Sequence, residues 1–133
     1  MRIFLARDWR WPIYEEAFAD ALLRLKAEII RFSWKHYFHG PLGRLQSKFP
    51  IPGPSMRRLN RDLLKAARNF DPEVIFVWRG THVRSRALRL LKKETGALLI
   101  SYNNADPFGP RARTQVQWHH HFFWRLYLKC VPV

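Results

Sequence analysis

The chain has 133 residues, of which 47% are hydrophobic and 15% aromatic, so it can bury the core of one domain and does not have a disordered composition. A single cysteine, Cys130, excludes an internal disulfide and fits a reducing compartment. No run of about 18 apolar residues indicates a transmembrane helix, and charged residues interrupt the apolar start where a signal peptide would have its core. These features predict a cytoplasmic protein.

The charge balance is strongly basic and unevenly distributed. Twenty-four lysine and arginine residues against ten aspartate and glutamate residues give a formal net charge of +14. Residues 55–93 hold eleven of the basic residues and three of the acidic ones, a net charge of +8. Such a field attracts the phosphates of nucleic acids or of anionic lipid headgroups, although a solvated basic face is the simpler interpretation.

The first third of the chain reads as a strand, a helix and a second strand. The opening MRIFLA predicts a buried strand over residues 2–6, and Pro12 begins an amphipathic helical pattern. The side of this helix expected to be buried carries Ile13, Tyr14, Ala17, Phe18, Ala21, Leu22 and Leu25, and the solvated side carries Glu15, Glu16, Asp20, Arg24 and Lys26. A second strand over residues 29–34 completes a βαβ unit, which requires the two strands to be parallel.

The middle of the chain begins with an irregular segment and continues as a long basic helix. Glycines and prolines punctuate residues 35–54, which we interpret as a surface excursion with one short helix near residues 42–48. Ser55 is the expected N-cap of the next helix. That helix is expected to bury Met56, Leu59, Leu63, Leu64 and Ala67 and to expose Arg57, Arg58, Arg61, Lys65 and Arg68.

The remaining pattern continues the alternation of strands and helices. A strand over residues 74–78 follows the turn at Asp71, a helix ends at Gly96, and a fourth strand covers residues 97–102. The tail favours one more helix over residues 118–130. Continuous apolar strands that alternate with helices predict an α/β fold, a Rossmann-like doubly wound parallel sheet of about four strands with helices on both faces.

The segments that follow the predicted strands hold the candidate binding residues. In an open parallel sheet, ligands bind outside the carboxyl ends of the strands, at a topological switch point. The residues in these segments are Arg7, Asp8, Trp9, Arg79, Gly80, Thr81, Tyr102, Asn103, Asn104 and Asp106. Amides and carboxylates pair with hydroxyl groups, and aromatic rings stack on sugar rings, so the mixture favours a hydroxyl-rich ligand. Two simpler interpretations stay open: a surface ion pair between Arg7 and Asp8, and a plain turn at Asp106.

Several other classes of site are disfavoured. The first predicted strand is followed by RDWRWP rather than by G-x-G-x-x-G, and no P-loop lysine motif is present, which argues against dinucleotide oxidoreductases and P-loop NTPases. The consecutive His119, His120 and His121 would diverge on a helix, and His36 and His39 have no nearby third ligand. No metal site is therefore expected.

Several segments also resemble the N-terminal domain of the CgeB-like (spore maturation protein) glycosyltransferases: MRIFLARDW, LNRDLLKAARNFDPEVIFVWRG with the helix after it, and GALLISYNNADPFG. The family pattern is N-x-x-L-L-x-x-A-x-x-x-x-P-D-x-V-x-V-x-K-G, followed by a strand that ends in a Tyr, Asp, Asp-Pro-Phe cluster. The matching residues are Asn60, Leu63, Leu64, Ala67, Pro72, Val74, Val77, Gly80, Tyr102, Asp106, Pro107 and Phe108. The chain departs from the pattern at Glu73, Arg79 and Asn104, where Asp, Lys, and Asp or Pro are usual.

The resemblance implies a GT-B architecture, in which two Rossmann-like domains face each other across a cleft. Residues 1–133 would then be a single, incomplete N-terminal domain on the acceptor side of a glycosyltransferase, which moves a sugar from a nucleotide-sugar donor to an acceptor hydroxyl. Asp106 is the candidate catalytic base, and the other candidate residues would bind the acceptor. No cofactor is expected on this chain, because the nucleotide-sugar donor would bind a C-terminal domain that the chain lacks, and the chain alone is expected to be inactive.

The expected partners follow from the same resemblance. They are a sugar or lipid-linked acceptor and the C-terminal donor domain of the full-length protein, with peripheral contact between the basic helix and the inner face of an anionic membrane as an open alternative to a solvated surface. The alternative function is a non-catalytic basic α/β module that binds nucleic acid or an anionic membrane surface. Nucleic acid is the less expected partner, because the chain shows no helix-turn-helix, RNA-recognition or zinc-finger pattern.

Overall fold

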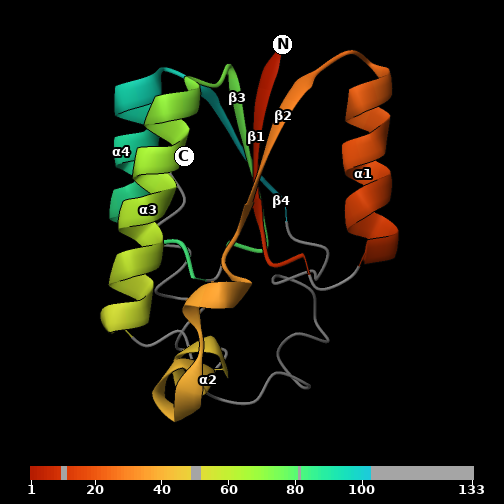
Figure 1. The fold of residues 1–133 in the computed structure, drawn as a ribbon. Coiled ribbons are helices and arrows are strands. Elements are labelled where there is room, and N and C mark those ends of the chain that lie inside the picture. The colour runs from red at the N-terminus through yellow and green to blue at the C-terminus, as the bar shows by residue number, and fades with distance from the viewer. Residues whose placement is uncertain (10–11, 49–51, 81, 103–133) are drawn as a thin grey trace, which may run out of the picture.

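The computed structural model describes residues 1–9, 12–48, 52–80 and 82–102. Parallel strands form a central layer, with helices on either side of it (Figure 1). The elements in chain order are β1 (Arg2–Arg7), α1 (Pro12–Arg24), β2 (Glu28–Ser33), the 3₁₀ helix η1 (Lys35–Tyr37), α2 (Gly40–Lys48), α3 (Pro54–Phe70), β3 (Val74–Trp78), α4 (Ser85–Thr95) and β4 (Leu98–Tyr102). The helix predicted for the tail of the chain lies outside the described residues.

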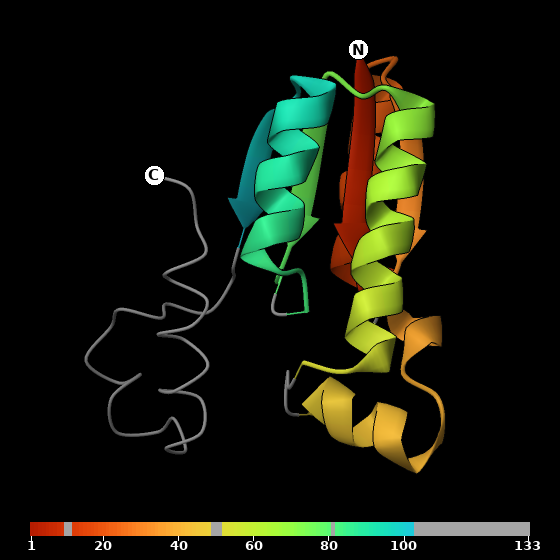
Figure 2. The same cartoon turned by 90° about the vertical axis from the view of Figure 1, so that its left-hand side faces the viewer.

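The sheet has the strand order β2-β1-β3-β4, and every neighbouring pair is parallel. Helix α1 covers one face, and α3 and α4 cover the other (Figures 1 and 2). The predicted doubly wound α/β fold is therefore confirmed. The chain moves outward from β1 to β2 and then returns past β1 to β3, so the topological switch point lies between β1 and β3 at their carboxyl ends.

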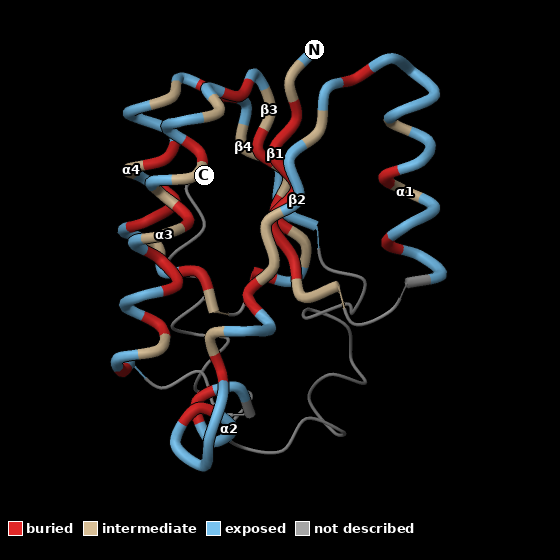
Figure 3. Tube along the Cα trace, viewed as in Figure 1, coloured by how far each residue is buried: buried red, intermediate tan, exposed pale blue. Residues whose placement is uncertain are grey.

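The two faces of the sheet bury cores of different size. On the side of α3 and α4, the core includes Phe4, Ala6, Leu59, Leu63, Ile75, Val77 and Leu91. The smaller core under α1 consists of Ile3, Leu5, Ala19 and Ala27, with partly buried residues around it. Side chains of β1 alternate between the two cores, as the pleat of a strand requires, and Figure 3 shows the resulting buried centre between largely exposed outer helix surfaces.

The buried side of α1 differs from the predicted one. Ile13 and Leu25, expected to face the core, are 82% and 73% exposed, whereas Ala19 and Glu15, a residue expected in solvent, are buried. The helix is thus rotated by roughly a quarter turn from the predicted orientation. Two features explain the difference: small Ala19 allows close approach to the sheet, and Glu15 pairs with a buried arginine at the end of β1.

Helix α3 begins one residue before the predicted N-cap. Gly53 is the capping residue and Pro54 occupies the first turn, so the cap predicted at Ser55 is wrong. Proline is favoured in that position because its missing N–H group would have no helical partner there. Gly53 also packs tightly, since a Cβ atom on it would lie 1.5 Å from Nε2 of the buried Gln46 in α2.

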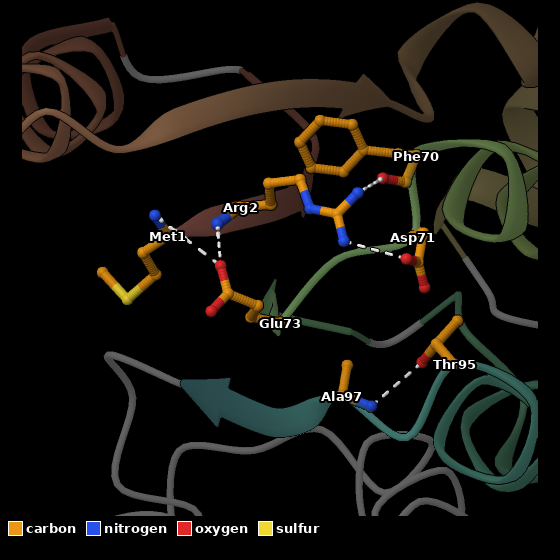
Figure 4. A network of polar contacts seen from close by, with 7 residues as sticks. All are labelled: Met1, Arg2, Phe70, Asp71, Glu73, Thr95 and Ala97. Atoms are coloured by element: carbon orange, nitrogen blue, oxygen red, sulfur yellow. Dashed lines mark hydrogen bonds and ion pairs between the residues drawn. The ribbon is translucent and has the colours of Figure 1, made fainter.

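Polar contacts close the amino-terminal edge of the sheet (Figure 4). The guanidinium of Arg2 donates to Asp71 at 2.8 Å and to the carbonyl of Phe70 at 3.3 Å. Glu73 accepts a hydrogen bond from the backbone N–H of Arg2 at 2.6 Å, which holds the pKa of Glu73 below its usual value. Glu73, one of the departures from the family pattern, thus ties the start of β1 to β3, far from the carboxyl ends of the strands.

Candidate functional site

A buried ion pair lies at the carboxyl edge of the sheet, next to the switch point. Arg7 is the last residue of β1, and its side chain is 3% exposed. One guanidinium nitrogen, Nη2, lies 2.5 Å from Oε1 of Glu15 in α1, whose side chain is 5% exposed. Neither charge would be stable at this depth alone, because burial removes the water that solvates it. The pair therefore fixes the first turn of α1 against the end of β1.

Two tryptophan rings lie against the guanidinium of Arg7. Its Cζ atom is 4.0 Å from the ring centroid of Trp78, the last residue of β3, and 5.1 Å from that of Trp9. Arg31 of β2 lies against the ring of Trp9 as well, at 5.0 Å. Cation–π contacts of this kind hold a guanidinium in one orientation. Arg7, Trp9 and Trp78 thus form one fixed group next to the switch point.

Within the described part of the chain, three hydrogen-bond donors of this group have no acceptor. Among the described residues, none accepts a hydrogen bond from Nε or Nη1 of Arg7 or from Nε1 of Trp9, although all three atoms are buried. A buried donor without a partner costs about 1–3 kcal/mol, so an acceptor oxygen placed here would be strongly favoured. Burial lowers the pKa of Arg7 to about 10, opposed by the charges of Glu16 and Asp8, so the side chain is a cation at neutral pH.

Aromatic side chains continue from this group across the sheet. The rings of Trp78 and Tyr102 meet edge to face with centroids 4.9 Å apart, and Phe18 of α1 lies 4.9 Å from Phe76 and 5.7 Å from Trp78. Tyr102 ends β4 and is 45% exposed. The aromatic cluster of Trp9, Phe18, Phe76, Trp78 and Tyr102 therefore leads from the buried Arg7 to the protein surface. Such rings stack on the apolar faces of other rings.

The backbone is unusual on both sides of the switch point. Trp9 and Arg79, which follow β1 and β3, have φ angles of 54° and 51°, in the left-handed region that bulky residues rarely adopt. The backbone N–H of Arg79 donates to the carbonyl of Tyr102 at 2.8 Å, which keeps the ends of β3 and β4 together. Lys26 and Asp71, in turns at the opposite edge of the sheet, have the same conformation with φ angles of 57° and 51°, so positive φ is a feature of the turns of this fold and does not by itself identify a site.

The structure places the predicted site residues unequally. Arg7, Trp9 and Tyr102 belong to the group just described, and Asp8 is half-buried beside it. The open alternative of a surface ion pair between Arg7 and Asp8 is wrong, because Arg7 is buried and pairs with Glu15. Arg79 is exposed, and the carbonyl of buried Gly80 accepts a hydrogen bond within the turn that leads to α4. The predictions at Thr81, Asn103, Asn104 and Asp106 lie outside the described residues.

Sequence reasoning missed two members of the site, Glu15 and Trp78. Glu15 has the same helical spacing as Phe18, Ala19 and Leu22, which identifies it as part of the buried stripe once the rotation of α1 is known. The sequence pattern identifies Trp78 only as the last residue of a strand. Because parallel strands β1 and β3 are neighbours, residues at their last positions face one another, and this rule would have found the tryptophan.

The asparagine of the family-like pattern has an architectural role. Asn60 in α3 is buried, and its Nδ2 donates to the carbonyls of Met56 at 2.7 Å and His82 at 3.0 Å. Its Oδ1 accepts from the backbone N–H of Arg84, the residue that caps α4, at 2.8 Å. Asn60 therefore fastens the β3–α4 turn to α3, and it does not belong to the carboxyl-edge site.

The described residues contain no group of three or more metal-binding side chains and no helix long and apolar enough to cross a membrane. The fold defines the class of the chain as an α/β protein with a Rossmann-like parallel sheet. Comparisons with family models, curated proteins and solved structures give no match.

Proposed function

We propose that the chain is the acceptor-side domain of an enzyme that transfers a sugar from a nucleotide-sugar donor to an acceptor hydroxyl. The observation that carries this proposal is the combination of buried donors on Arg7 and Trp9, which have no acceptor among the described residues, with an aromatic cluster that reaches the surface. Hydroxyl oxygens can accept from those donors, while the C–H face of a sugar ring stacks on an aromatic ring. The resemblance to CgeB-like glycosyltransferases points to the same ligand.

The local charge favours a neutral acceptor over a nucleotide. Among the described residues, Glu15 pairs with Arg7, and the charges of Glu16 and Asp8 also favour the cation. These carboxylates offset the charge of the guanidinium. A diphosphate gains little from a cation that is already neutralised, whereas a hydroxyl-rich acceptor needs only its N–H donors. This supports the division in which the donor binds a separate domain.

The chemistry that the domain would support is displacement at the anomeric carbon of the donor by the acceptor hydroxyl, with the nucleoside diphosphate as leaving group. The contribution of Arg7 and Trp9 would be to hold the acceptor in one orientation, which lowers the entropic part of the barrier. Asp106 stays the candidate base from the sequence; it lies outside the described residues, and the binding experiment does not depend on it.

A titration followed by the indole N–H signals of ¹⁵N-labelled protein tests the proposal. Glucose, N-acetylglucosamine and maltose are the probes, with uridine diphosphate as the donor-side comparison. We expect at least one sugar to shift the Trp9 and Trp78 signals until they saturate. The dissociation constant should be in the millimolar range, which corresponds to a binding free energy of about −4 kcal/mol. Uridine diphosphate should not shift these signals.

The variant Trp9→Phe should weaken sugar binding at least tenfold, since it removes the Nε1 donor and reduces the stacking surface. Trp34→Phe is the matched control, because Trp34 is a tryptophan in the core on the opposite face of the sheet. Tighter binding of uridine diphosphate than of any sugar at Trp9 and Trp78 would refute the acceptor-side assignment.

A further inference from the structure

Helices α3 and α4 lie side by side on one face of the sheet (Figure 2). Their outer surfaces, with the residue that caps α4, carry ten exposed basic side chains: Arg57, Arg58, Arg61, Lys65, Arg68, Arg84, Arg86, Arg89, Lys92 and Lys93. We call this set the α3–α4 basic surface. The sequence predicted one basic helix, and the fold places a second beside it.

Little of this charge is neutralised within the protein. The acidic residues of the two helices are Asp62 and Glu94, which pair with Arg61 at 3.0 Å and with Arg68 at 2.5 Å. Within the described parts of the chain, the other eight basic side chains have no ion-pair partner. Eight neighbouring cations repel one another, so a surface with many negative charges would bind here favourably.

The surface offers charge without apolar or aromatic groups. The exposed large hydrophobic residues of the described chain lie outside α3 and α4. Both helices lie flat on the sheet, so neither projects into a nucleic-acid groove, and no aromatic ring is available to stack on unpaired bases. The cations occupy two parallel rows, and the 17-residue α3 alone spans about 25 Å. A broad layer of phosphate headgroups matches this arrangement.

A second feature favours a lipid bilayer. Helix α2 lies beyond the N-terminal end of α3, on the same side of the sheet (Figures 1 and 2). Its Leu42 and Leu45 are 58% and 48% exposed, and Arg44 between them is exposed too. Stable membrane attachment requires two signals, and exposed leucines beside a basic surface supply an apolar one.

We propose that the α3–α4 basic surface docks on an anionic lipid bilayer, with Leu42 and Leu45 of α2 inserted at the level of the headgroups. Helix α2 lies at the carboxyl edge of the sheet, on the side that α3 and α4 cover (Figure 1). The proposal rests on the basic surface and α2, so it does not depend on the ligand that binds near Arg7.

Co-sedimentation with lipid vesicles tests the docking. The full chain should bind vesicles with about 30% phosphatidylglycerol in phosphatidylcholine, should not bind pure phosphatidylcholine, and should dissociate as salt rises from about 100 mM to 500 mM. The variant Lys65→Gln/Arg89→Gln/Lys93→Gln should lose at least tenfold in partition coefficient, since each basic residue near an anionic surface contributes measurably. None of the three side chains makes a hydrogen bond or ion pair within the described residues.

The matched control is Arg24→Gln/Lys26→Asn/Lys35→Gln, which removes the same net charge from exposed positions outside the basic surface. This control should bind nearly as well as the unaltered chain. Leu42→Ser/Leu45→Ser should weaken binding to the anionic vesicles, and the remaining electrostatic binding should be more sensitive to salt. Circular dichroism checks that each variant is folded.

Equal losses in the two charge variants would overturn the proposal, because net charge alone would then explain binding. The proposal would also be overturned if the chain bound a random duplex DNA more tightly than the anionic vesicles at the same salt concentration, and if Lys65→Gln/Arg89→Gln/Lys93→Gln abolished that binding. The surface would then be assigned to nucleic acid. The sugar titration reports on the carboxyl edge near Arg7, and the vesicle assay reports on the α3–α4 basic surface. Either proposal can therefore fail while the other stands.

Discussion

The ion pair between Arg7 and Glu15 is the residue-scale feature on which the candidate site depends. Its geometry, 2.5 Å between the charged atoms with both side chains buried, gives a direct prediction. Glu15→Ala leaves the buried guanidinium uncompensated and should lower the free energy of unfolding by about 3–5 kcal/mol, measured by urea denaturation. The double variant Arg7→Met/Glu15→Leu fills a similar volume with apolar groups and should recover most of the loss.

The same double variant separates stability from binding. We expect it to be nearly as stable as the natural pair but unable to bind sugar at Trp9, because the donors on Arg7 are gone. If the double variant were as unstable as Glu15→Ala, the two residues would not compensate one another, and the account of the site would be wrong.

His82 provides a pH-dependent test at the same scale. Its ring Nε2 donates to the carbonyl of Ser47 at 3.0 Å, and its ring lies 4.7 Å from that of Phe38. Burial lowers the pKa of His82 below 6.5, opposed by the hydrogen bond to Ser47 and by the charge of Asp8. Below pH 6.5 the unfolded chain therefore binds this proton more readily than the folded one, so stability falls as the pH falls.

We expect His82→Gln, which keeps a donor for the Ser47 carbonyl, to reduce the loss of stability between pH 7 and pH 5 measured by urea denaturation. The exposed His39 provides the control position, and the pH profile of His82→Gln should differ from that of His39→Gln. A profile that is identical in all three proteins would show that His82 does not titrate differently in the folded state.

At the scale of elements, Asn60 connects two helices that the chain separates by β3. Its side chain makes three hydrogen bonds, two of them to the turn before α4. Asn60→Ala would leave the N–H of Arg84 and the carbonyl of His82 without these partners and should cost about 1–3 kcal/mol by chemical denaturation. Asn69→Ala, an exposed position of the same helix, should change stability by less than about 0.5 kcal/mol. Equal effects would remove this role from Asn60.

The elements also show what the sequence could and could not predict. The order of strands and helices was predictable because apolar runs such as the one in β3 and caps such as Gly96 are local signals. The rotation of α1 was not predictable, because its apolar residues cover half of the helix surface. The side that is buried is decided by the ion pair between Glu15 and Arg7 at the end of β1. Local periodicity contains no information about such a pair.

At the scale of the molecule, topology decides which residues meet. The carboxyl-edge position of the site was predictable, since parallel strands with crossover helices send all their carboxyl ends to one edge. The combined basic surface could not be predicted from the pattern of either helix alone, because it requires α3 and α4 to lie on the same face. That arrangement follows once β3 and β4 are known to lie on the same side of β1, since right-handed crossovers then place both helices together.

The basic surface also predicts how the stability of the whole protein depends on salt. Repulsion among the eight cations that have no ion-pair partner among the described residues opposes folding, and added salt screens it. The ion pairs that salt would weaken are mostly exposed, such as the one between Arg31 and Glu16, and contribute little. Raising NaCl from about 20 mM to 300 mM should therefore increase the melting temperature, by roughly 4 °C if about 1 kcal/mol of repulsion is removed.

The location of the repulsion can be tested with the two charge variants of equal net charge. Lys65→Gln/Arg89→Gln/Lys93→Gln should have a higher melting temperature than the unaltered chain at low salt, because it removes three cations from the α3–α4 basic surface. Its melting temperature should also increase less when salt is added. Arg24→Gln/Lys26→Asn/Lys35→Gln should keep most of the salt response, since its positions lie outside that surface. Anionic vesicles should raise the melting temperature at low salt as NaCl does, because headgroup phosphates would neutralise the same cations. Identical salt responses in the two variants would show that the repulsion is spread over the molecule, and the basic surface would then have no separate energetic role.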